Sequence, residues 1–205
     1  MGREREALRF GALGPHCIHV CVDMQRLFGE ESEWNTPWLP RVLPRVERIV
    51  AAHPAETVFT RFITLDSAAE GRGTWRRYYE RWHNLTRREL APGLLDLLPP
   101  LQRYVPPATV FDKTVYSPWL GTAFENLLRA RDADTVIVSG GETDVCVLGT
   151  VLGAVDRGLR TIVVTDAVCS SSDESHDASM GLYHARYGQQ VETVDTETLL
   201  AAWTD

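Results

Sequence analysis

The sequence predicts an α/β protein with a three-layer, Rossmann-like fold built around a mostly parallel six-stranded sheet. Short runs rich in Val and Ile alternate with stretches of helical periodicity, which is typical of βαβ units. The runs at 134–140 and 160–167 are continuously apolar, as strands buried on both faces are. A chain of 205 residues suffices for one sizeable core, so we expect a single domain at 1–205.

The expected elements follow in order along the chain. Strands are predicted at 17–24, 57–63, 108–113, 134–140, 160–167 and 189–196. Between and after them, apolar residues at helical spacing predict helices at 43–53, 119–131 and 146–158, from Ser171 to about 187, and at 197–203. The helix at 146–158 ends at Gly158, a favourable C-terminal stop.

The segment 64–107 does not fit this alternation. It is rich in Arg and aromatic residues, and we interpret it as an excursion that either covers the site as a lid or forms an oligomer contact. Trp75, Tyr78, Tyr79 and Trp82 are spaced to share one helix face. Packing and substrate contact both remain open for these four rings.

Composition narrows the classes of partner and location. The net charge of -7 gives no attraction to a phosphate backbone, so we expect neither nucleic acid nor membrane as a partner. No apolar run approaches the ~20 residues that span a bilayer. The N-terminal stretch carries charges of both signs and does not resemble a signal peptide, so a cytoplasmic location is expected. The four cysteines lack metal-ligand spacing and are expected to be free thiols.

Three reactive side chains fall at the carboxyl ends of predicted strands. Asp23 ends the first strand, Lys113 ends the third, and Cys146 follows the Gly-rich loop after the fourth. Lys113 is the single lysine among 21 Lys and Arg residues. Because α/β folds bind ligands at this edge of the sheet, the three groups are expected to meet there.

Cys146 admits two interpretations from its position alone. A thiol at a helix start can be a small buried hydrophobe, or a nucleophile whose pKa the helix dipole lowers. Asp23 can cap the following helix or accept the thiol proton. Lys113 can be a chance survivor or the cation that favours the thiolate. Together, a Cys, an Asp and a Lys make a consistent nucleophile, base and electrostatic partner.

Three motifs at these residues resemble the isochorismatase-like cysteine hydrolase superfamily. They are "VCVDMQRLF" with Asp23, "FDKTVYSPW" with Lys113, and "VSGGETDVCVLGTVLGAVDRGLRTIVVTDAV" with Cys146. The similarity extends from about Cys17 to Val194. This superfamily includes nicotinamidases and N-carbamoylsarcosine amidohydrolases.

The resemblance implies a catalytic triad of Cys146, Asp23 and Lys113. It implies a cis peptide bond between Gly141 and Glu142, with the N–H groups of Glu142 and Cys146 forming an oxyanion hole. It implies a small-molecule substrate (an amide, ureide or imide cleaved at its C–N bond) and a homodimer or homotetramer. Nicotinamidases also carry an Asp-x-His metal motif, but here Ser67 and Ala68 follow Asp66. No metal and no other cofactor is therefore expected.

Some assignments stay open at this stage. Phe28, Trp38, Tyr116 and Trp119 follow strand ends and are candidate pocket walls, with packing as the alternative. His176 can line the pocket or lie in solvent near a helix start. The alternative functions are an isochorismatase-type vinyl-ether hydrolase with Cys146 idle, and a catalytically silent binding protein on the same fold.

Overall fold

Six parallel strands form one sheet at the centre of the protein, a computed structural model that describes residues 8–204. The first seven residues of the N-terminal stretch, where no signal peptide is expected, lie outside the described residues. The sheet order is β3-β2-β1-β4-β5-β6, and every neighbouring pair is parallel. The strands are β1 (Cys17–Val22), β2 (Thr57–Phe62), β3 (Thr109–Lys113), β4 (Thr135–Gly141), β5 (Arg160–Cys169) and β6 (Val191–Val194). The predicted fold class is confirmed.

Helices follow the strands in the described chain much as the periodicity predicts. They are α1 (Arg26–Gly29), α2 (Leu39–Ala52), α3 (Thr74–Arg81), α4 (Pro99–Gln102), α5 (Ala123–Arg129), α6 (Cys146–Asp156), α7 (Asp173–Gly181) and α8 (Thr196–Ala202). Short 3-10 turns occur at η1 (Ala68–Glu70) and η2 (His83–Leu85), and α7 continues into a π-helical turn, η3 (Leu182–Arg186). Helix α2 starts earlier than predicted because Pro40 suits a first turn.

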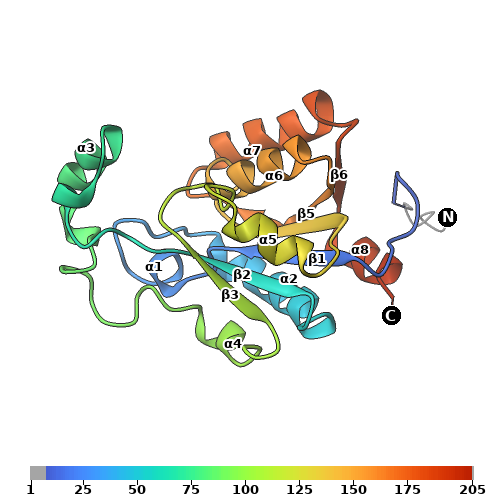
Figure 1. The fold of residues 1–205 in the computed structure, drawn as a ribbon, viewed down its shortest axis with the longest axis horizontal. Helices are drawn as coiled ribbons and strands as arrows, with labels where there is room; N and C mark the ends of the chain where they lie inside the picture. The colour runs from blue at the N-terminus through green and yellow to red at the C-terminus, as the bar shows by residue number, and fades with distance from the viewer. Residues whose placement is uncertain (1–7, 205) are drawn as a thin grey trace.

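The sheet is covered on both faces. Helices α2 and α8 pack on one face, and α5, α6 and α7 lie on the other (Figure 1). Alternation along β1 divides its side chains between two hydrophobic cores: Cys17 and Cys21 belong to one, and Ile18, Val20 and Val22 to the other. This arrangement fixes the carboxyl ends of the strands at one edge, where the reactive residues lie.

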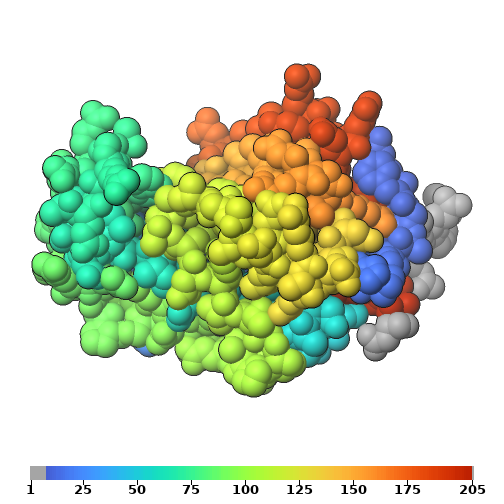
Figure 2. Space-filling view, in the orientation of Figure 1, coloured from blue at the N-terminus to red at the C-terminus, as the bar shows by residue number. Residues whose placement is uncertain are grey.

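The 64–107 excursion leaves the layered body and returns to it. It contains η1, α3, η2 and α4, and α3 stands apart from the sheet at the left of Figure 1. The same segment forms the teal and green end of the surface in Figure 2. The buried Gln25 amide ties its returning limb to the sheet, since it donates to the carbonyls of Phe62 and Leu95 and accepts from the Phe62 N–H. The excursion is thereby anchored beside the ends of β1 and β2.

Candidate active site

Asp23, Lys113 and Cys146 meet at the carboxyl edge of the sheet, and we call these three residues the polar floor. The Lys113 Nζ atom lies 2.7 Å from Asp23 Oδ2 and 3.4 Å from Cys146 Sγ. All three side chains are buried. Parallel strands β1, β3 and β4 all point toward this edge, which explains how residues 90 and 33 positions apart come into contact. The floor has the arrangement that the strand ends predict.

Each charged group of the floor has further partners. The Thr60 hydroxyl donates to Asp23 Oδ1 at 2.6 Å, and Lys113 also donates to the Val115 carbonyl at 3.3 Å. The Lys113 Nζ atom lies 5.1 Å from the centre of the Phe62 ring. Asp23 adopts a φ of 48°, in the left-handed region. Such backbone conformations cluster at functional sites, where the surrounding structure holds them.

The resting Cys146 group is a thiol rather than a thiolate. Burial raises the pKa of Cys146 well above its usual value, the negative charge of Asp23 adds to this rise, and Lys113 opposes it. The expectation that the helix start would lower this pKa is therefore wrong, because desolvation outweighs the favourable charges. For Lys113, burial acts to lower the pKa, but the interactions with Asp23 and Cys146 outweigh burial, and the net pKa is raised. The lysine therefore stays charged.

The loop between β4 and α6 carries the backbone expected for an oxyanion hole. The Gly141–Glu142 peptide bond is cis, as the resemblance implies. Cys146 is the first residue of α6, so its N–H has no acceptor within the helix. The Thr143 N–H donates to the Cys169 carbonyl at 2.8 Å, and the Tyr183 hydroxyl donates to the Thr143 carbonyl at 3.1 Å. These bonds hold the loop against β5 and η3.

The Glu142 side chain faces the end of β5. Its Oε1 atom accepts a hydrogen bond from the Ser171 N–H at 3.1 Å, and burial raises the pKa of the carboxyl group. Asp144, on the other side of the loop, accepts from the Ser170 hydroxyl. These two acidic residues thus both hold the segment after β5, and of the two only Glu142 lines the cavity above Cys146.

A cavity of about 290 Å³ opens above Cys146. Six aromatic rings line it, and we call them the aromatic wall: Phe28, Trp34, Phe62, Tyr78, Trp82 and Tyr116. The remaining lining residues are Glu33, Asn35, Glu142, Val145, Cys146 and Ser171. Two of the four candidate pocket residues, Phe28 and Tyr116, are therefore placed in the cavity. Tyr78 and Trp82 come from the excursion, so the excursion contributes to the cover of this site.

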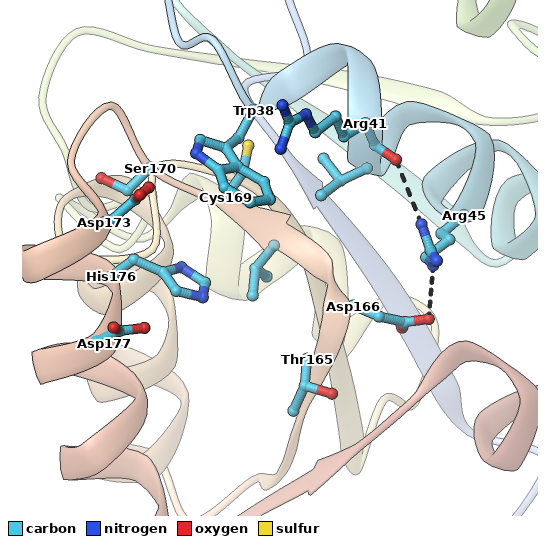
Figure 3. A pocket seen from close by; sticks show the side chains of 12 residues that line it. Trp38, Arg41, Arg45, Thr165, Asp166, Cys169, Ser170, Asp173, His176 and Asp177 are labelled. Atoms are coloured by element: carbon cyan, nitrogen blue, oxygen red, sulfur yellow. Dashed lines mark hydrogen bonds and ion pairs between the residues drawn. The ribbon is translucent and has the colours of Figure 1, made fainter.

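Trp38 and Trp119 lie elsewhere, and their assignment to this pocket is corrected. Trp38 lines a second cavity, of about 470 Å³, where the Arg41 guanidinium lies over its ring (Figure 3). The Trp119 ring is buried under α6, where its Nε1 donates to the Thr150 carbonyl at 2.9 Å. A Cβ atom at Gly153 would come within 2.0 Å of this ring. The absence of a side chain at Gly153 therefore leaves the space that the Trp119 ring occupies.

His176 also lies outside the cavity above Cys146. It points from α7 into the second cavity (Figure 3), and its Nδ1 lies 2.9 Å from the Thr143 hydroxyl. The N-cap of α7 is Ser172, whose hydroxyl accepts from the Ser175 N–H. The capping position is thus one residue later than the one that the sequence indicates at Ser171.

Several residues of the site escaped the sequence analysis. Thr60 is one of three polar residues in β2, with Thr57 and Arg61, so its polarity did not distinguish it as a partner of Asp23. Trp34 and Phe62 also carry no distinguishing signal, because one lies in an irregular segment and the other resembles any strand residue. Tyr78 and Trp82 were recognised as members of one helix face, but the spacing did not show what that face contacts.

The described residues offer no metal site that fits the nicotinamidase pattern. Asp66 forms an ion pair with Arg87. Between residues 8 and 204, no group of three or more His, Cys, Asp and Glu side chains is placed to bind a metal ion. No helix in the same range has the length and apolar character needed to cross a membrane.

Comparisons with known proteins show which family the chain belongs to. A cysteine hydrolase structure from Pseudomonas syringae superposes with a TM-score of 0.78 over 97% of both chains, at 21% identity. An uncharacterised isochorismatase family protein, PncA of Bacillus subtilis, is 33% identical over 111 residues, which cover 53% of this chain and 61% of that protein. Maleamate amidohydrolase of Pseudomonas putida is 31% identical over 86 residues, which cover 42% of this chain and 40% of that enzyme.

The matched segments therefore span less than two thirds of these two relatives. A domain family described as the isochorismatase domain matches residues 17–196. This range includes all six strands and the whole polar floor. The predicted resemblance is confirmed, and the chain belongs to the isochorismatase domain family.

Proposed function

We propose that the protein is a cysteine hydrolase that cleaves the C–N bond of a small amide, ureide or imide through a thioester intermediate. The observation that carries this proposal is the contact of Lys113 Nζ with both Asp23 and Cys146 at the base of a cavity. The similarity to maleamate amidohydrolase supports the same bond class.

The first step moves a proton within the floor. Asp23 accepts the Cys146 proton, and the negative charge passes from the carboxylate to the sulfur. Lys113 contacts both groups, so its ammonium group faces the negative charge before and after the transfer. This offsets the cost of forming a thiolate in a buried place, where burial raises the thiol pKa.

Acylation and hydrolysis follow. The thiolate attacks the carbonyl carbon, and the N–H groups of Glu142 and Cys146 stabilise the oxyanion. The C–N bond breaks as Asp23 returns its proton to the leaving nitrogen, which departs as ammonia or an amine. Water, deprotonated by Asp23, then attacks the thioester carbonyl and releases the carboxylic acid and the Cys146 thiol. The net reaction consumes one water for each C–N bond broken.

Replacement of the nucleophile tests this proposal. Ammonia release should be measured across a panel of small amides with wild type and with Cys146→Ala. We expect Cys146→Ala to lower kcat/KM by about a thousandfold or more, because nucleophile replacements in covalent hydrolases have effects of this size or larger. Mass spectrometry of acid-quenched wild type should show the acyl group on Cys146.

Cys169→Ala is the matched control. Cys169 is also a buried thiol, with a pKa that burial raises to about 12, but it lines the second cavity. Its replacement should change kcat/KM by no more than about threefold. Hydrolysis at the wild-type rate in Cys146→Ala would sink the thioester mechanism. Vinyl-ether hydrolysis that survives in Cys146→Ala would favour the reaction in which Cys146 is idle.

A further inference from the structure

The charged side chains that line the cavity above Cys146 are acidic, although the chain is rich in arginine. The sequence contains 21 Lys and Arg residues, yet among residues 8–204, which the structure describes, no cationic residue lines the cavity. Two of them, Glu33 and Glu142, are acidic. The Lys113 ammonium group lies beneath the cavity, but it is paired with Asp23 at 2.7 Å. The lining therefore presents negative charge and aromatic faces to a ligand.

Trp34 is the centre of the aromatic wall. Its ring lies 5.7 Å from the Tyr78 ring and 5.9 Å from the Phe62 ring, measured between centroids. The rings of Phe28 and Trp82 lie 6.3 Å and 6.2 Å from it. Electron-rich ring faces attract cations, and groups of such rings bind alkylated ammonium ions. The Phe62 ring already makes such a contact with the Lys113 ammonium group.

Both tyrosines of the wall stay neutral. Burial raises the pKa of Tyr78 and of Tyr116, and the neighbouring groups do not reverse this rise. Glu33 lies at an exposed position and Glu142 at a half-buried one, so carboxylates occur both at the mouth and deeper in the cavity. A carboxylate ligand would meet these groups and find no cation among the lining residues.

We propose that the cavity selects amides whose acyl part carries an alkylated ammonium group, and that Trp34 is the main determinant of this preference. The proposal rests on the proposed hydrolase function for the position of the carbonyl group above Cys146. It separates the protein from maleamate amidohydrolase, whose named substrate is an anion. The cavity volume of about 290 Å³ restricts the substrate to a small molecule.

A pair of isosteric amides tests the charge preference directly. (Trimethylammonio)acetamide and 3,3-dimethylbutanamide have the same shape and differ in one atom, a positively charged nitrogen or a neutral carbon. Their Kd values should be measured by calorimetry on the full-length Cys146→Ala protein, with maleamate as the anionic probe. We expect the cationic amide to bind about tenfold more tightly than the neutral one, since a desolvated cation–π contact has about this effect. Maleamate should bind more weakly than both.

Trp34→Leu and Trp38→Leu form a matched pair for the wall. Trp34 lines the cavity above Cys146, and Trp38, four positions later, lines the second cavity. In Trp34→Leu, the ratio of the two Kd values should fall to less than about threefold. In Trp38→Leu, the ratio should stay at the wild-type value. Glu33→Gln should weaken only the cationic amide, by about twofold to threefold, and high salt should remove that difference.

The outcomes separate this inference from the hydrolase proposal. Equal Kd values for the isosteres, tighter binding of maleamate, or no binding of the cationic amide at millimolar concentration would each overturn the charge preference. A ratio that persists in Trp34→Leu would overturn the role of Trp34. Tight binding of the cationic amide without ammonia release from wild type would contradict the hydrolase proposal and leave the charge preference intact.

Discussion

The polar floor and the aromatic wall meet at one cavity, which Cys146 and the six rings line, yet they are built in different ways. The floor consists of three residues at the ends of regular elements, and its two hydrogen bonds join residues that parallel strands bring together. The wall takes its six rings from the segment after β1, the end of β2, the excursion and the segment after β3. Regular topology thus positions the chemistry, and irregular connections shape the space that a substrate enters.

The two regions also differ in how a defect would spread. Each member of the floor is a charged or reactive group in a buried place, so the loss of one partner leaves another unpaired. The rings of the wall contact one another through apolar and aromatic surface, and each can be lost without leaving a buried charge. We therefore expect changes in the floor to affect catalysis and stability together, and changes in the wall to affect mainly substrate binding.

Lys113→Met should have the largest effect. It leaves Asp23 charged and unpaired at 1% exposure, which should lower the free energy of unfolding by about 3–5 kcal/mol. It also removes the charge that opposes the high pKa of Cys146, so kcat should fall by about 10²–10⁴. Urea denaturation and amide hydrolysis measure the two effects.

Two further variants complete this test. Adding Asp23→Asn to Lys113→Met removes the unpaired charge, so stability should recover in part while activity stays lost. Arg61→Met is the more exposed control, because the ion pair of Arg61 with Asp112 joins β2 and β3 where both side chains reach solvent, at 25% and 48% exposure. It should cost less than about 1 kcal/mol. A Lys113→Met protein as stable as Arg61→Met would contradict the idea that the floor is a coupled buried unit.

The contrast between floor and wall also explains what the sequence could predict. Asp23, Lys113 and Cys146 were placed together because strand ends in a parallel sheet share one edge, and that rule needs only the positions of the strands. Phe28 and Tyr116 lie close behind strand ends, and their placement in the cavity follows from the same rule. Trp34 lies in a segment without periodicity, so no pattern indicated it.

The predictions that were wrong, for Trp119 and for the pKa of Cys146, depended on packing that the local sequence does not show. Trp119 has the position of a pocket residue, but Gly153 on α6 leaves room for its ring in the core. The small residues of α6 allow a neighbour to approach closely, but they do not identify that neighbour. The pKa of Cys146 depends on the balance between desolvation and charge, and burial is a property of the packed structure rather than of the local sequence.

His19 provides an intermediate test, on the strand that leads to Asp23. Its ring is buried, and burial lowers its pKa to about 3. The Thr57 hydroxyl donates to the His53 carbonyl, so Thr57 Oγ1 accepts from His19 Nδ1 and His19 Nε2 accepts from the Ser139 hydroxyl. The neutral ring is thus fully paired, and a charged ring could no longer accept a hydrogen bond from the Ser139 hydroxyl.

This pKa has a defined consequence for stability. The unfolded chain binds a proton at His19 below about pH 6.5, whereas the folded chain does so only near pH 3. Stability is therefore highest above pH 6.5 and declines as the pH falls through this window. The site should cost about 2 kcal/mol between pH 7 and pH 5. In urea denaturation, the free energy of unfolding of wild type should fall by about 2 kcal/mol more than that of His19→Gln between pH 7 and pH 5.

A direct titration gives an independent measurement for His19. The NMR signal of its ring should keep the chemical shifts of a neutral imidazole at pH 5. Titration of His19 near pH 6.5 would contradict the buried, neutral assignment. It would also show that the part of the sheet next to the floor admits water.

Trp82→Leu should have the smallest effect, and it tests the independence of the wall. Trp82 is half-buried at the C-terminal end of α3 and contacts the wall through the edge of the Trp34 ring. We expect the free energy of unfolding to fall by about 1 kcal/mol or less, and KM for a cleaved amide to rise about twofold to fivefold. The value of kcat should change by less than about twofold, because no atom of the floor loses a hydrogen-bond partner. Steady-state kinetics separate the effect on kcat from the effect on KM. A hundredfold fall in kcat at unchanged KM would show that the wall positions the floor.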